Sequence, residues 1–245
     1  MATGGTPGTC GDGVVGPGEQ CDLGSNNSLQ PAFFVTQAAL SFSATPIVRP
    51  ASATDFYNYT SASAHTGFEE LGTSRIMLYL DKSDLSLSLV VFHGIDNNTS
   101  GLEQPSSQVQ MVFSGLPSAV TVAVSDDPGE LAMTSSTSAT GTWKFQNNSD
   151  GGALAGLPLP GNWEIYVSPA FVSGISTWTW LQQDGSTVTL DPTQPITIKA
   201  SASAAQCRTD CTVPRCGDGI LDGGEICDDG GLPASSCASD CMSFQ

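Results

Sequence analysis

Short runs of alternating apolar and polar residues fill the chain between about Gln30 and Ala205, and clusters of Gly, Pro, Asn, Asp and Ser separate the runs. An alternation with a period of two predicts β-strands with one buried face, and the clusters predict the turns between them. No segment has a convincing helical pattern. The ten predicted strands begin at Ala32, Ser74, Leu85, Ser107, Ala119, Gly141, Asn162, Ile175, Ser186 and Pro195.

This pattern predicts an all-β domain. Ten strands in roughly 175 residues, with frequent turn signals between them, are typical of two antiparallel sheets packed as a β-sandwich of the jelly-roll kind. A closed β-barrel is the alternative.

A second pattern lies on both sides of this domain. Residues 10–24 read CGDGVVGPGEQCDLG and residues 216–230 read CGDGILDGGEICDDG, so nine of fifteen positions are identical. The second copy is followed closely by a cysteine pair in CASDC (residues 237–241), whereas the matching CRTDC (residues 207–211) follows the first copy only after a long interval. We interpret this as a four-cysteine repeat present twice, with the first copy split by the β domain.

The motif resembles the cysteine-rich repeat of secreted and surface proteins of myxobacteria and related bacteria. The resemblance rests on Cys-Gly-Asp-Gly, on Gly-Glu-x-Cys-Asp and on the closing cysteine pair. It implies an extracellular location and a repeated architecture, and it implies no reaction. The expected domains are residues 1–29 plus 206–213 for the split repeat, 30–205 for the inserted β-sandwich and 214–245 for the second repeat.

The cysteines are expected to form disulfides. Paired repeats without a Cys-x-x-Cys motif, in a chain with two histidines, favour disulfides over zinc and indicate an oxidising compartment. The split repeat allows three pairings, and we favour the two that join its halves, because a local pair would leave the insert untethered. The eight cysteines are Cys10, Cys21, Cys207, Cys211, Cys216, Cys227, Cys237 and Cys241.

The net charge of the chain limits the classes of partner that it is expected to bind. The chain has 24 acidic and 7 basic residues and a net charge of −17, which disfavours nucleic acid and anionic membranes. No apolar run approaches the ~20 residues that span a bilayer. The first residues, MATGGTPGTC, lack the basic segment and apolar core of a signal peptide. We therefore expect a mature extracellular or cell-surface protein without direct membrane insertion.

Two groups of carboxylates are candidate calcium ligands, because calcium prefers six to eight oxygen ligands. Asp126, Asp127 and Glu130 in SDDPGE follow a predicted strand, and Asp96 and Asp150 lie in turns that would have to converge on them. The repeats supply the second group, Asp218, Glu225 and Asp228, which match Asp12, Glu19 and Asp22. In both groups the alternative role is the capping of turns by bonds to backbone amides.

Trp178 and Trp180 are two residues apart on one predicted strand and therefore point to the same face. Such a pair of indoles is either a platform on which sugar rings stack or part of the sandwich core. The core is the favoured interpretation.

No motif of a hydrolase, a zinc protease or a phosphate-binding loop is present. The sequence therefore predicts a non-catalytic structural or adhesive protein that displays the sandwich to a glycan or a protein on another surface. The alternatives are a subunit of a self-assembling extracellular filament, bound to copies of itself, and a secreted glycan-active enzyme. Calcium is the one candidate cofactor.

Overall fold

The computed structural model describes residues 9–28, 32–96, 106–230 and 236–245. The chain divides into two compact units, one formed by residues 1–33 with 200–245 and the other by residues 34–199. The second unit corresponds to the predicted insert, and the first unit holds both cysteine repeats. Among the described residues no helix has the length and apolar character to cross a membrane.

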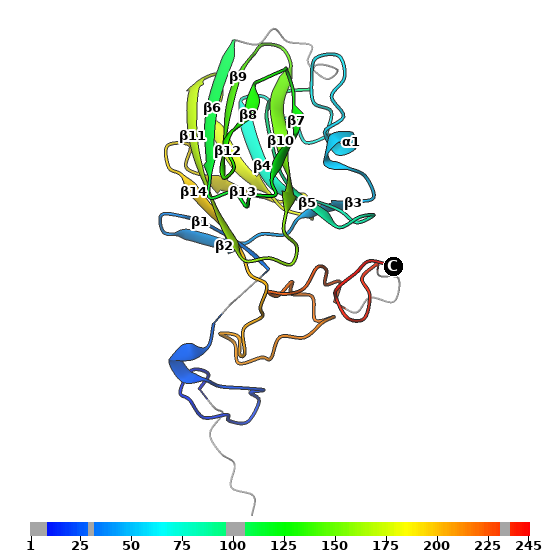
Figure 1. The fold of residues 1–245 in the computed structure, drawn as a ribbon. Coiled ribbons are helices and arrows are strands. Elements are labelled where there is room, and N and C mark those ends of the chain that lie inside the picture. The colour runs from blue at the N-terminus through cyan, green and yellow to red at the C-terminus, as the bar shows by residue number, and fades with distance from the viewer. Residues whose placement is uncertain (1–8, 29–31, 97–105, 231–235) are drawn as a thin grey trace, which may run out of the picture. The chain divides into compact units, whose positions relative to one another are not determined.

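Two sheets form the inserted unit, which confirms an all-β sandwich (Figure 1). The first sheet has the order β2-β1-β14-β11-β6-β9-β8. Its strands are β1 (Phe33–Gln37), β2 (Leu40–Ser43), β6 (Ser107–Ser114), β8 (Leu131–Ser135), β9 (Ser138–Phe145), β11 (Trp163–Ser173) and β14 (Ile196–Ala200). Because β1 and β14 are neighbours, the chain enters and leaves the sandwich side by side, as an insertion requires.

The second sheet has the order β13-β12-β4-β5-β10-β7, with β3 beside β4. Its strands are β3 (Ile47–Arg49), β4 (Thr73–Asp81), β5 (Ser86–Gly94), β7 (Thr121–Ser125), β10 (Ser149–Leu157), β12 (Thr177–Leu181) and β13 (Thr187–Leu190). The pairs β3·β4 and β4·β12 are parallel, so this sheet is mixed, whereas its other pairs are antiparallel as predicted.

The position of each strand in its sheet explains its pattern of buried and exposed residues. In β6 buried and more exposed residues alternate because one face of the first sheet meets solvent. In β4 and β5 nearly every residue is buried, because the second sheet is covered on both faces. One face packs in the sandwich interior, and the other carries an apolar cluster that includes Tyr57 of the short helix α1 (Ala53–Tyr57).

The helix α1 contradicts the expectation of no helix. It has only five residues, too few for an apolar period to appear in the sequence. Local chemistry defines its ends: the Ser52 side chain accepts a hydrogen bond from the Asp55 amide, and Asn58 ends the helix in the left-handed conformation at φ 49°. The helix contacts β7 and β10, beside which it lies in Figure 1.

The two repeats have the same disulfide connectivity. Cys10–Cys211 and Cys21–Cys207 close the split copy, and Cys216–Cys241 and Cys227–Cys237 close the second, so the first cysteine joins the fourth and the second joins the third in each. This confirms that the disulfides of the split copy join its two halves. A short 3-10 helix, η1 (Gly24–Asn26), follows the first motif. Four intramolecular disulfides favour an oxidising, extracellular-type environment.

Candidate functional site

Three acidic side chains and a tyrosine meet at one end of the second sheet. Asp126 and Glu130 come from the connection between β7 and β8, Asp150 is the second residue of β10, and Tyr57 ends α1. We call Asp126, Glu130 and Asp150 the acidic cluster. Asp126 and Asp150 are each 4% exposed, and Tyr57 is fully buried. The structure thus brings together three of the carboxylates that the sequence predicted to converge.

The DDPGE segment, residues 126–130, forms a tight turn that positions Glu130 in the acidic cluster. The Glu130 amide donates to the Asp127 carbonyl at 3.2 Å, which closes a turn with Pro128 at its second position and Gly129 at its third. Gly129 has a φ of 89°, as a type II turn requires at that position. The turn directs Glu130 back toward the strand that it has just left, and one Glu130 oxygen accepts the Asp127 amide at 3.2 Å.

Hydrogen bonds hold the other two elements against each other. The Ser63 and Ser149 hydroxyls lie 2.9 Å apart, and the Ser149 amide donates to Ser63 Oγ at 3.0 Å. This contact fixes the start of β10 against the loop that follows α1. The Asp126 amide donates to the Gly151 carbonyl at 3.3 Å, so Asp126 continues the β7·β10 pairing beyond the end of β7.

The polar groups that act on the Asp126 side chain are those of Asp150 and Tyr57, but within the described part of the chain this side chain has no hydrogen-bond partner at an ordinary distance. Both of its carboxylate oxygens and the Tyr57 hydroxyl are buried without one. Asp150 influences the pKa of both other acids, and Asp126 and Glu130 influence the pKa of Asp150 in turn.

Burial of the acidic cluster raises the pKa values of its carboxyl groups, so they keep their protons to a higher pH than exposed carboxyl groups do. Burial raises the pKa of Asp126 to about 6, that of Glu130 to about 7 and that of Asp150 to about 8. The neighbouring acids add to the rise, since a second negative charge disfavours ionisation. Burial, followed by the negative charges of Asp126 and Asp150, also raises the pKa of Tyr57 well above its ordinary value.

Two predicted members of this site lie elsewhere. Asp127 is exposed, and one of its carboxylate oxygens accepts the Tyr59 hydroxyl at 3.2 Å. Asp96 forms an ion pair with His65 at 3.3 Å. The sequence did not single out Tyr57, because a tyrosine at the end of a five-residue helix has no motif that marks it.

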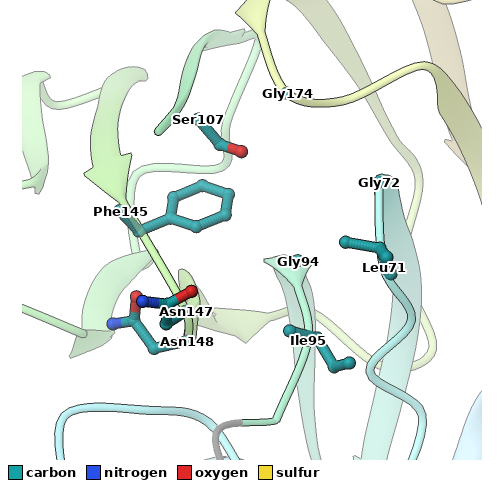
Figure 2. A pocket seen from close by; sticks show the side chains of 9 residues that line it. All are labelled: Leu71, Gly72, Gly94, Ile95, Ser107, Phe145, Asn147, Asn148 and Gly174. Carbon is teal, nitrogen blue, oxygen red and sulfur yellow. The ribbon is translucent and has the colours of Figure 1, made fainter. Parts of the chain in front are cut away.

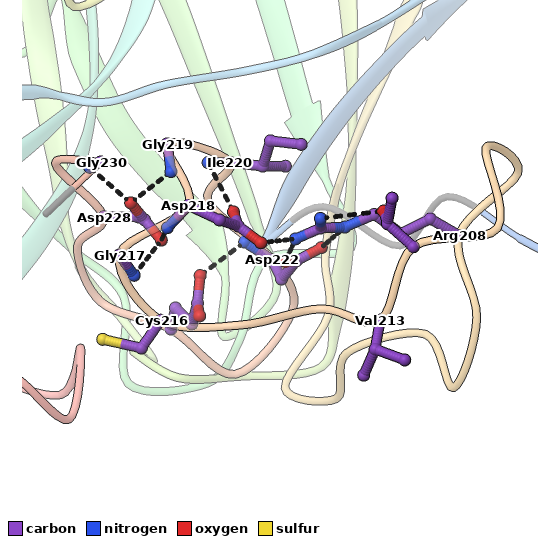
Figure 3. Close-up of polar contacts among 12 residues, drawn as sticks. Arg208, Val213, Cys216, Gly217, Asp218, Gly219, Ile220, Asp222, Asp228 and Gly230 are labelled. Atoms are coloured by element: carbon purple, nitrogen blue, oxygen red, sulfur yellow. Dashed lines mark hydrogen bonds and ion pairs between the residues drawn. The ribbon is translucent and has the colours of Figure 1, made fainter. Parts of the chain in front are cut away.

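The carboxylates of the repeats cap turns. In the second repeat, Asp228 accepts the amides of Gly217 and Gly219 at 2.8 Å, as Figure 3 shows. Glu225 accepts the Asp222 amide at 2.9 Å, and Asp218 accepts the Ile220 amide at 3.1 Å. Calcium binding at Asp218, Glu225 and Asp228 stays a prediction.

In each repeat a glutamate, an aspartate and a cysteine also lie close enough together to hold a metal ion, with Glu19, Asp22 and Cys211 in the split copy. In the second copy the three are Glu225, Asp228 and Cys241. Both cysteines belong to disulfides, so neither sulfur is a thiolate ligand.

An ion pair links the two repeats. Arg208 of the split copy donates to Asp218 at 2.8 Å and also contacts Asp222, as Figure 3 shows. The Arg208 and Asp222 side chains are 4% and 1% exposed. A buried pair of this kind is costly to break, because the remaining charge has no partner.

The interpretation of Trp178 and Trp180 as a platform for sugar rings is wrong. Trp178 and Trp180 are both fully buried, and their rings make edge contacts with Phe171 and Phe42 of the first sheet. They fill the space between the sheets. This agrees with the interpretation of the pair as core.

Another buried polar group lies near a small cavity. His93 is fully buried, its Nδ1 lies 2.9 Å from Ser74 Oγ, and burial lowers its pKa to about 3. A cavity of about 20 Å³ lies between Gly94, Phe145 and Asn148, among other residues (Figure 2). That volume holds one water molecule and excludes a substrate.

Comparisons of the chain with protein-family models, with curated proteins and with solved structures found no match. The resemblance of the repeats to the bacterial cysteine-rich repeat therefore stays a prediction from the sequence. The fold, the disulfide pattern and the acidic cluster are the observations from which a function has to be inferred.

Proposed function

We propose that this protein is a non-catalytic extracellular display module, whose sandwich is mounted on disulfide-rich repeats and presented to a glycan or protein on another surface. The observation that carries the proposal is the covalent base of the sandwich. Cys10–Cys211 and Cys21–Cys207 bracket the insert across sequence separations of 201 and 186 residues. Such a base keeps a domain attached and folded in an environment without cellular chaperones.

The solvent face of the first sheet supports a role in binding. On β6 and β11, Val112 and Tyr166 are 47% and 46% exposed, and Gln110 and Ser168 lie on the same face. Register places Val112 opposite Ser168 across the β6·β11 pair. The Tyr166 hydroxyl donates to Glu164 at 2.6 Å, and Glu164 also pairs with Lys199. An exposed tyrosine held in this way beside hydrogen-bonding side chains suits contact with a glycan or a protein.

The filament alternative receives less support from the repeats. By alignment of the repeats, Ala238 takes the place of Arg208, and Gly16 takes the place of Asp222. At the free ends of the pair, the contact that joins the two repeats therefore lacks its arginine and one of its two aspartates, while Asp12 takes the place of Asp218. A filament built by repeating that contact would need residues that these positions do not have.

The test uses the full oxidised chain. We expect sedimentation to show a monomer and a glycan or cell-surface array to show binding that Tyr166→Ser and Val112→Ser reduce at least tenfold. Leu71→Ser is the matched control, because Leu71 is 51% exposed and lies in a loop of the same unit. Filaments in electron micrographs, turnover of a glycan substrate, or binding that the paired variants leave unchanged would each contradict the proposal.

A further inference from the structure

The two repeats differ in what covers the segment between their first and second cysteines. In the second repeat, residues 218–224 lie against the part of the chain that precedes them. The Ala32 amide donates to the Leu221 carbonyl at 3.1 Å, and the Gly224 amide donates to the Ser201 carbonyl at 3.1 Å. Backbone groups of the segment therefore pair with the two chains that enter and leave the insert, much as an added strand pairs with a sheet edge.

Packing and charge complete this contact. Gly223 lies so close to the preceding chain that a Cβ on it would collide with the Ser203 carbonyl oxygen. Arg208 donates to Asp218 at 2.8 Å and pairs with the buried Asp222 (Figure 3). The segment is thus recognised by two backbone hydrogen bonds, by close packing at a glycine and by an arginine.

The equivalent segment of the split copy, residues 12–18, is uncovered, and we call it the open segment. Its apolar residues Val14 and Val15 are 67% and 58% exposed. A Cβ on Gly224 of the second repeat would lie 2.9 Å from a carbonyl oxygen, whereas a Cβ on the matching Gly18 would meet no described residue within 4 Å. The same motif is therefore occupied in one copy and open in the other.

The open segment also keeps hydrogen-bonding groups that the contact uses. Within the described part of the chain, the Val15 carbonyl and the Gly18 amide form no hydrogen bond, although their equivalents in the second repeat do. Asp12, which matches Asp218, accepts the Val14 amide at 2.8 Å with one oxygen, and its other oxygen has no partner among the described residues. In Asp218 that second oxygen accepts the arginine.

We propose that the open segment binds the closing half of a further cysteine-rich repeat, in which an extended chain leads to an arginine placed like Arg208. The two repeats of this chain do not supply that partner. Ala32, Ser201 and Arg208 are already engaged by the second repeat. Ala238 stands where a second copy of the chain would need the arginine. The partner is therefore a repeat other than the two in this sequence.

The chemistry of the open segment sets the strength of the contact. Gly16 stands where the second repeat has Asp222, so Asp12 alone receives the arginine. A single exposed ion pair contributes little, and burial of the two exposed valines supplies most of the affinity. We therefore expect a reversible contact. The inference does not depend on the proposed function, because the open segment and the sandwich belong to different structural units.

The experiment uses the full oxidised protein, labelled with ¹⁵N, and a synthetic peptide as the probe. The peptide ASASAAQSRT copies residues 200–209 with Cys207→Ser. We expect saturable shifts of the Val14, Val15 and Gly18 amide signals at millimolar peptide. Arg208→Ala in the peptide should weaken binding about threefold by removing the ion pair. Val14→Ser combined with Val15→Ser in the protein should weaken it about tenfold by removing apolar contact.

Leu23→Ser is the matched control, because Leu23 is an apolar residue of the same repeat that is 40% exposed and lies outside the open segment. It should bind the peptide within twofold of the original protein. The absence of shifts at millimolar peptide, shifts spread over other surfaces, or equal binding of the Arg208→Ala peptide would overturn the proposal. If the valine variant does not fold, the original protein decides alone through its response to the two peptides.

Discussion

Removal of the two disulfides at the base of the sandwich, one at a time and then together, should reveal a redundant clamp. The variants are Cys10→Ala with Cys211→Ala, Cys21→Ala with Cys207→Ala, and the combination of all four. In each single-disulfide variant the remaining disulfide still joins the two ends of the sandwich. The unfolded insert therefore stays a closed loop until both disulfides are absent.

The magnitude follows from the loop lengths. Separations of 186 and 201 residues correspond, in the chain-entropy model, to about 5 kcal/mol of stabilisation for either closed loop, and the two loops differ by only about 0.1 kcal/mol. Loss of one disulfide should thus change the free energy of unfolding of the sandwich by less than about 1 kcal/mol. Loss of both should cost about 5 kcal/mol, or roughly 10–20 °C in Tm for a unit of this size.

Intrinsic fluorescence reports this unit selectively, because all four tryptophans lie within residues 34–199. Urea and thermal unfolding would be followed by tryptophan emission, with Cys227→Ala plus Cys237→Ala as a control that should leave the transition of the sandwich unchanged. A cost of several kcal/mol for one disulfide alone, or a negligible cost for both, would refute the reasoning.

Three further predictions concern charge and packing. The sandwich should lose stability as the pH rises from about 4 to about 8, because the folded acidic cluster holds protons in this range that the unfolded chain releases near pH 4. The urea midpoint of the sandwich should decrease with pH across this range, and Asp126→Asn should make that dependence weaker. The other titratable groups that face the cluster are Asp127, Tyr57 and Tyr59. Arg208→Ala should destabilise the second repeat by about 3–5 kcal/mol, because it leaves the buried Asp222 carboxylate unpaired. Dithiothreitol should then reduce the disulfides of that repeat faster than in the original protein. Addition of Asp222→Asn should restore part of the resistance to reduction. Gly151→Ala should cost the sandwich about 1–3 kcal/mol in urea unfolding, because a Cβ would press on the backbone of β5, whereas Gly129→Ala, at a positive φ in open space, should cost only about 1 kcal/mol.

The sequence predicted those parts of the fold that have a periodic or repeated signal. The nine shared positions revealed the split repeat, and spaced cysteines implied disulfides across the insert. The hairpin of β1 and β2 was predicted as one strand, because its turn uses Ala38, which has a φ of 49°, instead of a usual turn residue. Strand β10 was missed because Gly151 and Gly152 resemble a turn, although close backbone contacts in the sheet leave no room for a side chain.

The candidate site was predictable in part. Asp126 and Glu130 stand out in the sequence because they flank a proline-glycine turn. Their proximity to Asp150, however, depends on the pairing of β7 with β10. That pairing is long-range and leaves no local signature. Asp96 seemed equally suitable by composition, yet the structure pairs it with His65.

The split of the first repeat has a mechanical consequence. A pulling force applied before Cys10 and after Cys211 passes directly through the Cys10–Cys211 bond and bypasses the 200 residues between them. The sandwich therefore carries no load while that bond and its neighbour Cys21–Cys207 are intact. Reduction of both bonds would place the whole insert in the line of tension and, after unfolding, release roughly 700 Å of slack chain. The redox state of two bonds thus decides whether this molecule behaves as a short, inextensible tether or as a long, compliant one.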